Sequence, residues 1–285
     1  KANLQRAGEL VSQAAASGAS LVLLPELTPG GYDLTEAVWD SAETMAGPSV
    51  AWLKATAAHH GIHLGMSFLE ADREDFFNSF VLATPQGRIA GRVRKNPPAS
   101  AEAYFFRAGN DEHFIDTAIG RLGVSICYEA LLYERLKEHF RNRIDLLLMP
   151  LSAGTPTPVF PLRKRDSLAF EENIKVLAVH HASVLGVPVV MANKCGPLVT
   201  RMPAGLPDQN THFPGLSVVV DGGGVVRSQL GAAQGIALGD VTLDPARKTR
   251  AWPSPHGRWA LPVPWFSFFY PLAAFFGVRC YARNR

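Results

Sequence analysis

The chain has 285 residues, of which 47% are hydrophobic, and a formal net charge of +3. A chain of this length and composition can bury one substantial core, and no linker or internal repeat divides it. The small charge argues against a nucleic-acid-binding protein, because basic residues are scattered except at 163–165 and near the C-terminus. The three cysteines show neither a disulfide framework nor a metal-binding spacing, which is typical of a reducing, cytoplasmic compartment.

Helices and strands are expected to alternate along the chain. The pattern of apolar residues predicts helices over 2–17, 48–60, 130–142 and 163–184. Short apolar runs predict strands over 21–25, 61–70 and 122–126, and a hairpin over 76–94. Further strands are expected after each of the last two helices. This alternation predicts an α/β fold with two packed sheets.

Cys127 directly follows the apolar run 122–126 and precedes a predicted helix. Such a place at the rim of a sheet makes its thiol a candidate nucleophile. The positive end of the helix dipole would favour the thiolate over the thiol. The alternative is a buried structural cysteine.

Two further ionisable residues also close predicted strands. Glu26 ends the run Leu21–Pro25, and a carboxylate at the end of an interior strand points into whatever cleft lies there. Lys95 ends the second arm of the predicted hairpin. Taken singly, Glu26 is also typical of a solvated loop and Lys95 of a charged face.

In the order Glu26, Lys95, Cys127, the chain resembles the nitrilase superfamily of carbon–nitrogen hydrolases. Glu102 matches a second glutamate that the family commonly places after its lysine, and three later segments are also similar, namely 148–153, 186–193 and 215–221. The resemblance runs from about residue 2 to about residue 242 and implies a four-layer αββα sandwich that usually dimerises. It assigns residues 1–245 to a hydrolase domain whose first strand is missing, and 246–285 to a C-terminal tail.

The resemblance also implies a mechanism that needs no metal or organic cofactor. Cys127 would attack the substrate, Glu26 would act as base and acid, and Lys95 with the backbone N–H of Tyr128 would stabilise the oxyanion. Glu102 would support Lys95 or orient the substrate nitrogen. The residues expected to shape the substrate pocket are Tyr32, Tyr104, Phe105 and Glu129.

We therefore expect an amidase that forms a cysteine acyl-enzyme, with apolar or acyl-chain amides among its candidate substrates. The Arg that follows the cysteine in some N-carbamoyl hydrolases is absent from 127–131, and Cys127-Tyr128-Glu129 is more similar to apolipoprotein N-acyltransferases. Three alternatives stay open. They are a nitrilase that converts a nitrile to its acid, an N-acyltransferase that uses an amine acceptor, and an inactive membrane-associated scaffold.

The tail has no charged residue between Trp259 and Val278. It is crowded with aromatic residues that suit a membrane interface or a protein interface, among them Trp265, Phe266, Phe268, Phe269, Phe275 and Phe276. Three prolines, at 262, 264 and 271, predict that no single helix forms there. The segment is expected either to anchor the protein peripherally on a membrane surface or to pack against a second copy in a homodimer or higher homo-oligomer.

Overall fold

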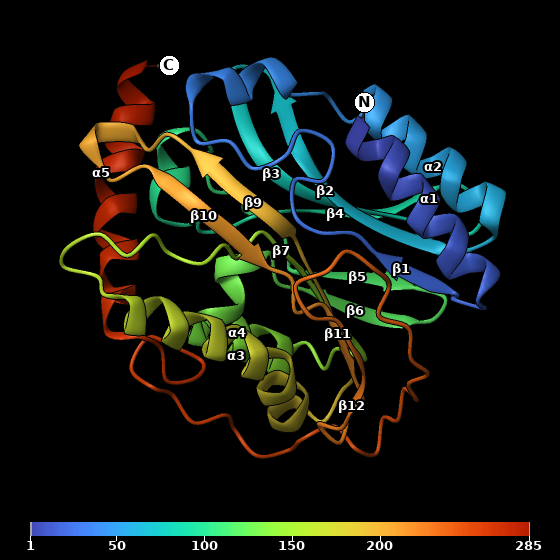
Figure 1. The fold of residues 1–285 in the computed structure, drawn as a ribbon. Coiled ribbons are helices and arrows are strands. Elements are labelled where there is room, and N and C mark those ends of the chain that lie inside the picture. The colour runs from blue at the N-terminus through green and yellow to red at the C-terminus, as the bar shows by residue number, and fades with distance from the viewer. Residues whose placement is uncertain (1, 285) are drawn as a thin grey trace.

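The computed structural model describes residues 2–284 and contains two main mixed sheets with flanking helices (Figure 1). The first sheet has the order β1-β2-β3-β4, in which β1 and β2 are parallel and the other pairs antiparallel. Its strands are β1 (Leu21–Leu23), β2 (His63–Asp72), β3 (Asp75–Ala83) and β4 (Ile89–Arg94). The predicted hairpin over 76–94 is therefore the β3–β4 pair.

The second sheet has the order β12-β11-β8-β7-β6-β5, with β6, β7 and β8 parallel to one another. Its strands are β5 (Phe114–Thr117), β6 (Gly120–Val124), β7 (Leu146–Leu151), β8 (Val189–Asn193), β11 (Val218–Val220) and β12 (Val226–Gln229). A separate antiparallel pair consists of β9 (Cys195–Thr200) and β10 (Gln209–Pro214).

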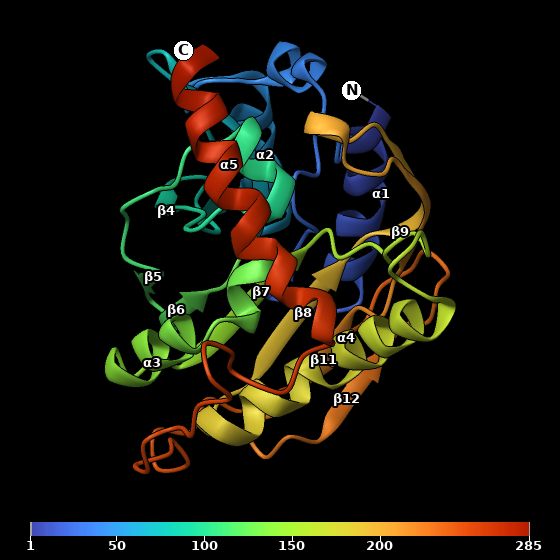
Figure 2. The same ribbon diagram turned by 90° about the vertical axis from the view of Figure 1, so that its left-hand side faces the viewer.

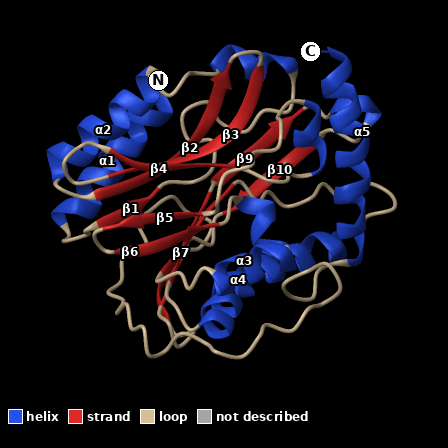
Figure 3. Ribbon diagram, turned by 180° about the vertical axis from the view of Figure 1, so that it is seen from behind, coloured by secondary structure: helices blue, strands red, loops and turns tan. Residues whose placement is uncertain are grey.

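The helices cover the outer faces of the two sheets (Figure 3). Val11 of α1 (Ala2–Ala16) and Leu53 of α2 (Pro48–His60) join the core against the first sheet. Leu136 of α3 (Tyr133–Arg141) and Leu177 of α4 (Lys164–Leu185) join the core against the second sheet.

A third core lies between the sheets and joins them. Phe80 of β3 and Val93 of β4 pack there with Val124 of β6 and Leu148 of β7, and all four side chains are fully buried. Each sheet is thus covered on both faces, which explains why its strands read as nearly continuous apolar runs. The predicted α/β fold with two packed sheets is confirmed.

The helix expected from residue 130 begins later than predicted. A short 3-10 helix, η3 (Cys127–Leu131), comes first, and Leu132 has the extended backbone angles φ −89° and ψ 129°. Four other 3-10 helices occur, namely η1 (Glu36–Ser41), η2 (Ser100–Tyr104), η4 (Pro203–Gly205) and η5 (Trp265–Phe268). Cys127 therefore opens a tight turn and not a long helix.

The C-terminal segment forms the helix α5 (Phe269–Asn284), so the expectation that prolines would prevent a helix is wrong for Pro271. Pro271 lies in the first turn, where the missing N–H leaves no helical hydrogen bond unmade. The helix lies along η2 of its own chain (Figure 2). Tyr281 adds a second attachment, because its hydroxyl accepts a hydrogen bond from the Phe76 N–H at 3.0 Å.

The docking of α5 depends on Gly277. A Cβ at this position would lie 2.8 Å from the carbonyl carbon of Ala103 and 2.8 Å from the Tyr104 ring. We expect Gly277→Leu to displace α5 and to destabilise the fold by roughly 1–3 kcal/mol, because the backbone of η2 cannot yield. Chemical denaturation and proteolysis after residue 264 measure this effect. Ala282→Leu, on the exposed side of α5, is the matched control and should leave both unchanged.

Candidate active site

The structure brings Glu26, Lys95 and Glu102 into direct contact. Glu26 follows β1 and Lys95 follows β4, whereas Glu102 lies in η2. The Lys95 Nζ lies 2.7 Å from Glu26 Oε1 and 2.8 Å from Glu102 Oε2. One ammonium thus joins two carboxylates that are 69 and 7 residues away in the sequence.

These charges are buried, because the Glu26 and Lys95 side chains are 0% and 1% exposed. Burial alone would lower the pKa of Lys95, but the negative charges of Glu102 and Glu26 outweigh it and hold this pKa above its usual value. Burial raises the pKa of Glu102, and the Lys95 charge opposes the rise. The Lys95 ammonium is therefore charged throughout the physiological pH range.

Two neutral side chains also donate hydrogen bonds to the carboxylates of Glu26 and Glu102. The amide of Asn78, on β3, donates to Glu26 Oε1 at 2.7 Å, and the hydroxyl of Tyr32 donates to Glu102 Oε1 at 3.0 Å. The other oxygen of Glu26, Oε2, is buried and has no hydrogen-bond partner. A buried carboxylate oxygen without a partner costs free energy, and such an oxygen is available to accept a proton.

Cys127 lies beside this cluster at the start of η3. Its φ of 53° falls in the left-handed region, which is rare for residues other than glycine and occurs often at active sites. Burial raises the pKa of the thiol well above its usual value, the charge of Glu26 adds to the rise, and Lys95 opposes it. The thiol is therefore protonated at rest, in contrast to the thiolate that the helix dipole was expected to favour.

A model of the carbon-nitrogen hydrolase family matches residues 1–251 of the sequence. The chain belongs to the carbon-nitrogen hydrolase family. This confirms the superfamily that the Glu26, Lys95 and Cys127 motifs indicate, and the protein is an enzyme of the nitrilase/amidase type. The hydrolase is 26% identical over 257 residues to a probable nitrilase of Schizosaccharomyces pombe. The alignment covers 88% of this chain and 86% of that protein.

Solved structures show the same fold. A carbon-nitrogen hydrolase from Helicobacter pylori G27 superimposes with a TM-score of 0.73 at 24% identity, over 85% of this chain and 84% of that one. A mutant amidase from Nesterenkonia sp. AN1, which carries acrylamide added to its active-site cysteine, gives a TM-score of 0.70 at 22% identity. That match covers 87% of this hydrolase and 90% of the amidase chain.

Glu129, which was expected in the substrate pocket, is bound to the backbone beside both catalytic candidates. Its side chain is fully buried and accepts the Asn96 N–H at 2.7 Å and the Ile126 N–H at 2.6 Å. Burial would raise the pKa of Glu129, but His113 and Arg135 outweigh it and keep the carboxylate charged. Since Asn96 follows Lys95 and Ile126 precedes Cys127, Glu129 fixes the distance between the two catalytic candidates.

Tyr104 and Phe105, which were also expected in the substrate pocket, pack against other parts of the fold. The Phe105 ring is buried 5.9 Å from the Trp39 ring, and Tyr104 packs against Gly277 of α5. The Tyr128 ring is buried 5.1 Å from the ring of Tyr270. Of the four residues expected in the pocket, Tyr32 alone donates a side-chain hydrogen bond to a carboxylate of the cluster.

Sequence reasoning missed two residues of the site. Asn78 is a fully buried amide within the apolar strand β3, and a polar side chain in such a run is a signal that was available. Tyr270 comes from the first turn of α5. Burial raises its pKa, and negative charge at Cys127 would raise it further, so Tyr270 lies close to Cys127. No local pattern places this distant residue there.

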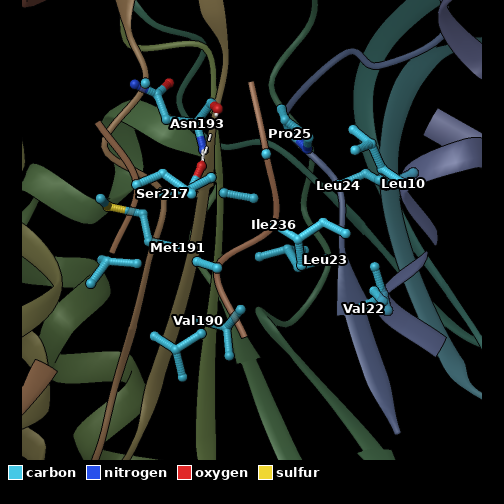
Figure 4. Close-up of a pocket in the computed structure, with 18 of the residues that line it drawn as sticks. Leu10, Val22, Leu23, Leu24, Pro25, Val190, Met191, Asn193, Ser217 and Ile236 are labelled. Carbon is cyan, nitrogen blue, oxygen red and sulfur yellow. Dashed lines mark hydrogen bonds between the residues drawn. The ribbon is translucent and has the colours of Figure 1, made fainter. Parts of the chain in front are cut away.

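A cavity of about 900 Å³ lies next to the cluster, between β1 and β8. Figure 4 shows Leu23 and Leu24 on one side of it and Val190 and Met191 on the other, with Ile236 between them. Glu26, Lys95 and Cys127 do not line the cavity, whereas Tyr32 and Lys194 do. Within residues 2–284, no group of three or more His, Cys, Asp or Glu side chains is placed to hold a metal ion.

The raised thiol pKa predicts how Cys127 reacts. Alkylation by iodoacetamide should show an inflection above the usual cysteine range of about 8.5, because the reactive thiolate forms only there. Lys95→Met should move the inflection higher still, since the Lys95 charge lowers this pKa. Subtracting the rate of a Cys127→Ser variant removes the signal of Cys195 and Cys280. An inflection below about 7 would contradict the protonated resting thiol.

Proposed function

We propose that this hydrolase is an amidase whose nucleophile is Cys127. The observation that supports it most directly is the unpartnered Oε2 of Glu26, since the other Glu26 oxygen is fixed by Lys95 at 2.7 Å. A protonated thiol requires a base at the moment of attack. Glu26 is proposed as that base.

In the first half of the reaction, the Cys127 sulfur attacks the amide carbon while Glu26 Oε2 accepts the thiol proton. Negative charge then develops on the amide oxygen, and the Lys95 ammonium with the Tyr128 N–H is proposed to stabilise it. Glu102 keeps Lys95 in place through its contact at 2.8 Å. Glu26 returns the proton to the departing nitrogen, which leaves a thioester.

In the second half, Glu26 takes a proton from water, and the water oxygen attacks the thioester carbon. The tetrahedral intermediate collapses to the acid, and the Cys127 sulfur regains the proton from Glu26. The same carboxylate thus serves as base and as acid in both halves, which a fixed and buried position permits.

The finer architecture is part of this proposal. We propose a four-layer αββα sandwich of the nitrilase type, supported by the separate cores beneath α1 and α2, between the sheets, and beneath α3 and α4. Residues 1–245 would form the hydrolase domain and 246–285 a tail that contacts the active site through Tyr270.

The mechanism predicts that turnover depends on Cys127 and Lys95. Ammonia release from a panel of short amides and long-chain acyl amides should be lost in Cys127→Ala. It should fall at least 10²–10³-fold in Lys95→Met, which is about the effect of removing an oxyanion donor. Thermal unfolding shows whether each variant is folded. Full activity of a folded Cys127→Ala variant would exclude the mechanism.

The same panel separates the alternatives. Preferential conversion of matching nitriles to acids would identify a nitrilase. Product formation that depends on an added amine would identify an N-acyltransferase. A protein that releases no product from any member of the panel, and whose Cys127 does not react with iodoacetamide, would fit the inactive scaffold.

The exposed face of α5 and η5 supports a surface partner. Six large side chains on it are between 37% and 52% exposed, namely Trp265, Phe268, Phe269, Leu272, Phe275 and Phe276. Phe266, which was expected in the same surface, is instead buried 6.3 Å from the Phe170 ring. Within residues 2–284, no helix has the length and apolar character needed to cross a bilayer.

We propose that this aromatic face binds an anionic membrane surface rather than a second copy of the chain. The support is charge, because residues 245–285 contain seven Lys or Arg and no Asp or Glu. In addition, the Trp265 indole donates to Asp166 at 2.9 Å, which places the aromatic face beside the exposed basic residues 163–165. Aromatic and basic side chains together are typical of helices that lie in the membrane interface.

This proposal predicts binding to vesicles that contain anionic lipid. Phe268→Ser with Phe275→Ser should weaken sedimentation with anionic vesicles at least 10-fold, because each Phe contributes about 1.5–3 kcal/mol on burial. Leu238→Ser, an exposed apolar residue away from α5, is the control and should bind as the parent does. A stable dimer that the double variant dissociates, without vesicle binding, would assign the face to a second copy.

A further inference from the structure

The proposed reaction leaves unused a half-buried cation near the catalytic candidates, Lys194. Lys194 follows β8, and its Nζ lies 3.3 Å from the backbone oxygen of Leu27, the residue after Glu26. It forms no ion pair with any carboxylate of residues 2–284, and its Nζ lies 5.9 Å from the centre of the Phe213 ring. An ammonium has three N–H donors, and the hydrogen bond to Leu27 uses one of them.

Lys194 lies between the catalytic candidates and the cavity. It lines the cavity together with Tyr32 and Phe213, whose rings are 6.3 Å apart. It is also close enough to Glu26 and Cys127 for their negative charges to raise its pKa. Lys194 is therefore near the catalytic candidates and also borders the cavity.

The two lysines of the site are not equivalent. Lys95 already pairs with two carboxylates at 2.7 and 2.8 Å, and in the proposed reaction it also faces the oxyanion, so it is not available to bind a second anionic group of the substrate. Lys194 has no such partner and has already lost part of its hydration through burial. A singly charged anion matches one ammonium, and a hydrogen bond between two charged groups is about twice as strong as a neutral one.

We propose that Lys194 binds a carboxylate of the substrate, so that this hydrolase acts on amides that carry a carboxylate elsewhere in the molecule. This rests on the proposed function, because it names the substrate class of the same site. It disfavours a purely apolar acyl chain at this point, since such a chain would leave the ammonium desolvated and unpaired.

The test compares two amides of the same length, a monoamide of a dicarboxylic acid and the corresponding alkyl amide. The ratio of their kcat/KM values should favour the acid amide in the parent enzyme and fall about 100-fold in Lys194→Met. Lys194→Arg should recover part of the ratio. Lys175→Met, which removes an exposed lysine paired with Glu172 on α4, is the matched control and should keep it. An unchanged ratio, or an equal loss for both amides, would overturn the proposal.

Binding provides a readout that does not depend on turnover. Calorimetry on the Cys127→Ala variant should detect the acid amide, and Lys194→Met in the same background should abolish its binding. Burial lowers the pKa of Lys194 to about 8, although Glu26 and Cys127 oppose the shift, so affinity should fall as the pH rises through about 8. Glu26 and Cys127 are the titratable groups that act on Lys194.

The two proposals can fail separately. Hydrolysis of both amides without any dependence on Lys194 would retain the amidase and exclude the carboxylate site. Specific binding of the acid amide without ammonia release would retain the carboxylate site and exclude the amidase. Absence of binding to Cys127→Ala, whether or not turnover occurs, would exclude the proposed role of Lys194.

Discussion

The ion cluster around Lys95 is the constraint on which the rest of the site depends. Two carboxylates and one ammonium are held almost without exposure, and removing water from each charge costs several kcal/mol. Such a cluster is stable only if every group keeps its partners, so Glu26 and Glu102 must stay within 2.7 and 2.8 Å of Lys95. Burial and the charge of Glu26 raise the pKa of the Cys127 thiol, so the proposed attack needs a neighbouring base.

The fold supplies this accuracy by placing each group where a strand ends. β4 ends directly before Lys95, and β1 and β6 each end three residues before Glu26 and Cys127. The apolar core between the two sheets sets the relative positions of these strands. Glu129 adds a direct link between the backbone after Lys95 and the backbone before Cys127. A rigid support of this kind is expected where reacting atoms must be held within fractions of an ångström.

The sequence was sufficient for the two packed sheets and for a candidate triad, because both follow from local patterns. Apolar runs that stop at an ionisable residue predicted Glu26 and Cys127, and the hairpin predicted Lys95. The orientation of Glu129 was not predictable in this way, since it depends on His113 and Arg135 reaching the same carboxylate. The helix at Pro271 was missed because a proline was treated as a helix breaker even at a position in the first turn, where it is tolerated.

Residues contributed by distant segments explain the remaining gap between sequence and site. Three residues near the cluster come from distant elements, namely Asn78 from β3, Lys194 from the end of β8 and Tyr270 from α5. Their spacing in the sequence does not predict that they lie close together. Tyr270 has a further consequence, because it is adjacent in sequence to Phe269 on the exposed aromatic face and packs on Tyr128 beside the nucleophile. Any partner that shifts the first turn of α5 therefore changes the packing around Tyr128. The first turn of α5 thus packs on the residue that follows Cys127, whatever surface the aromatic face contacts.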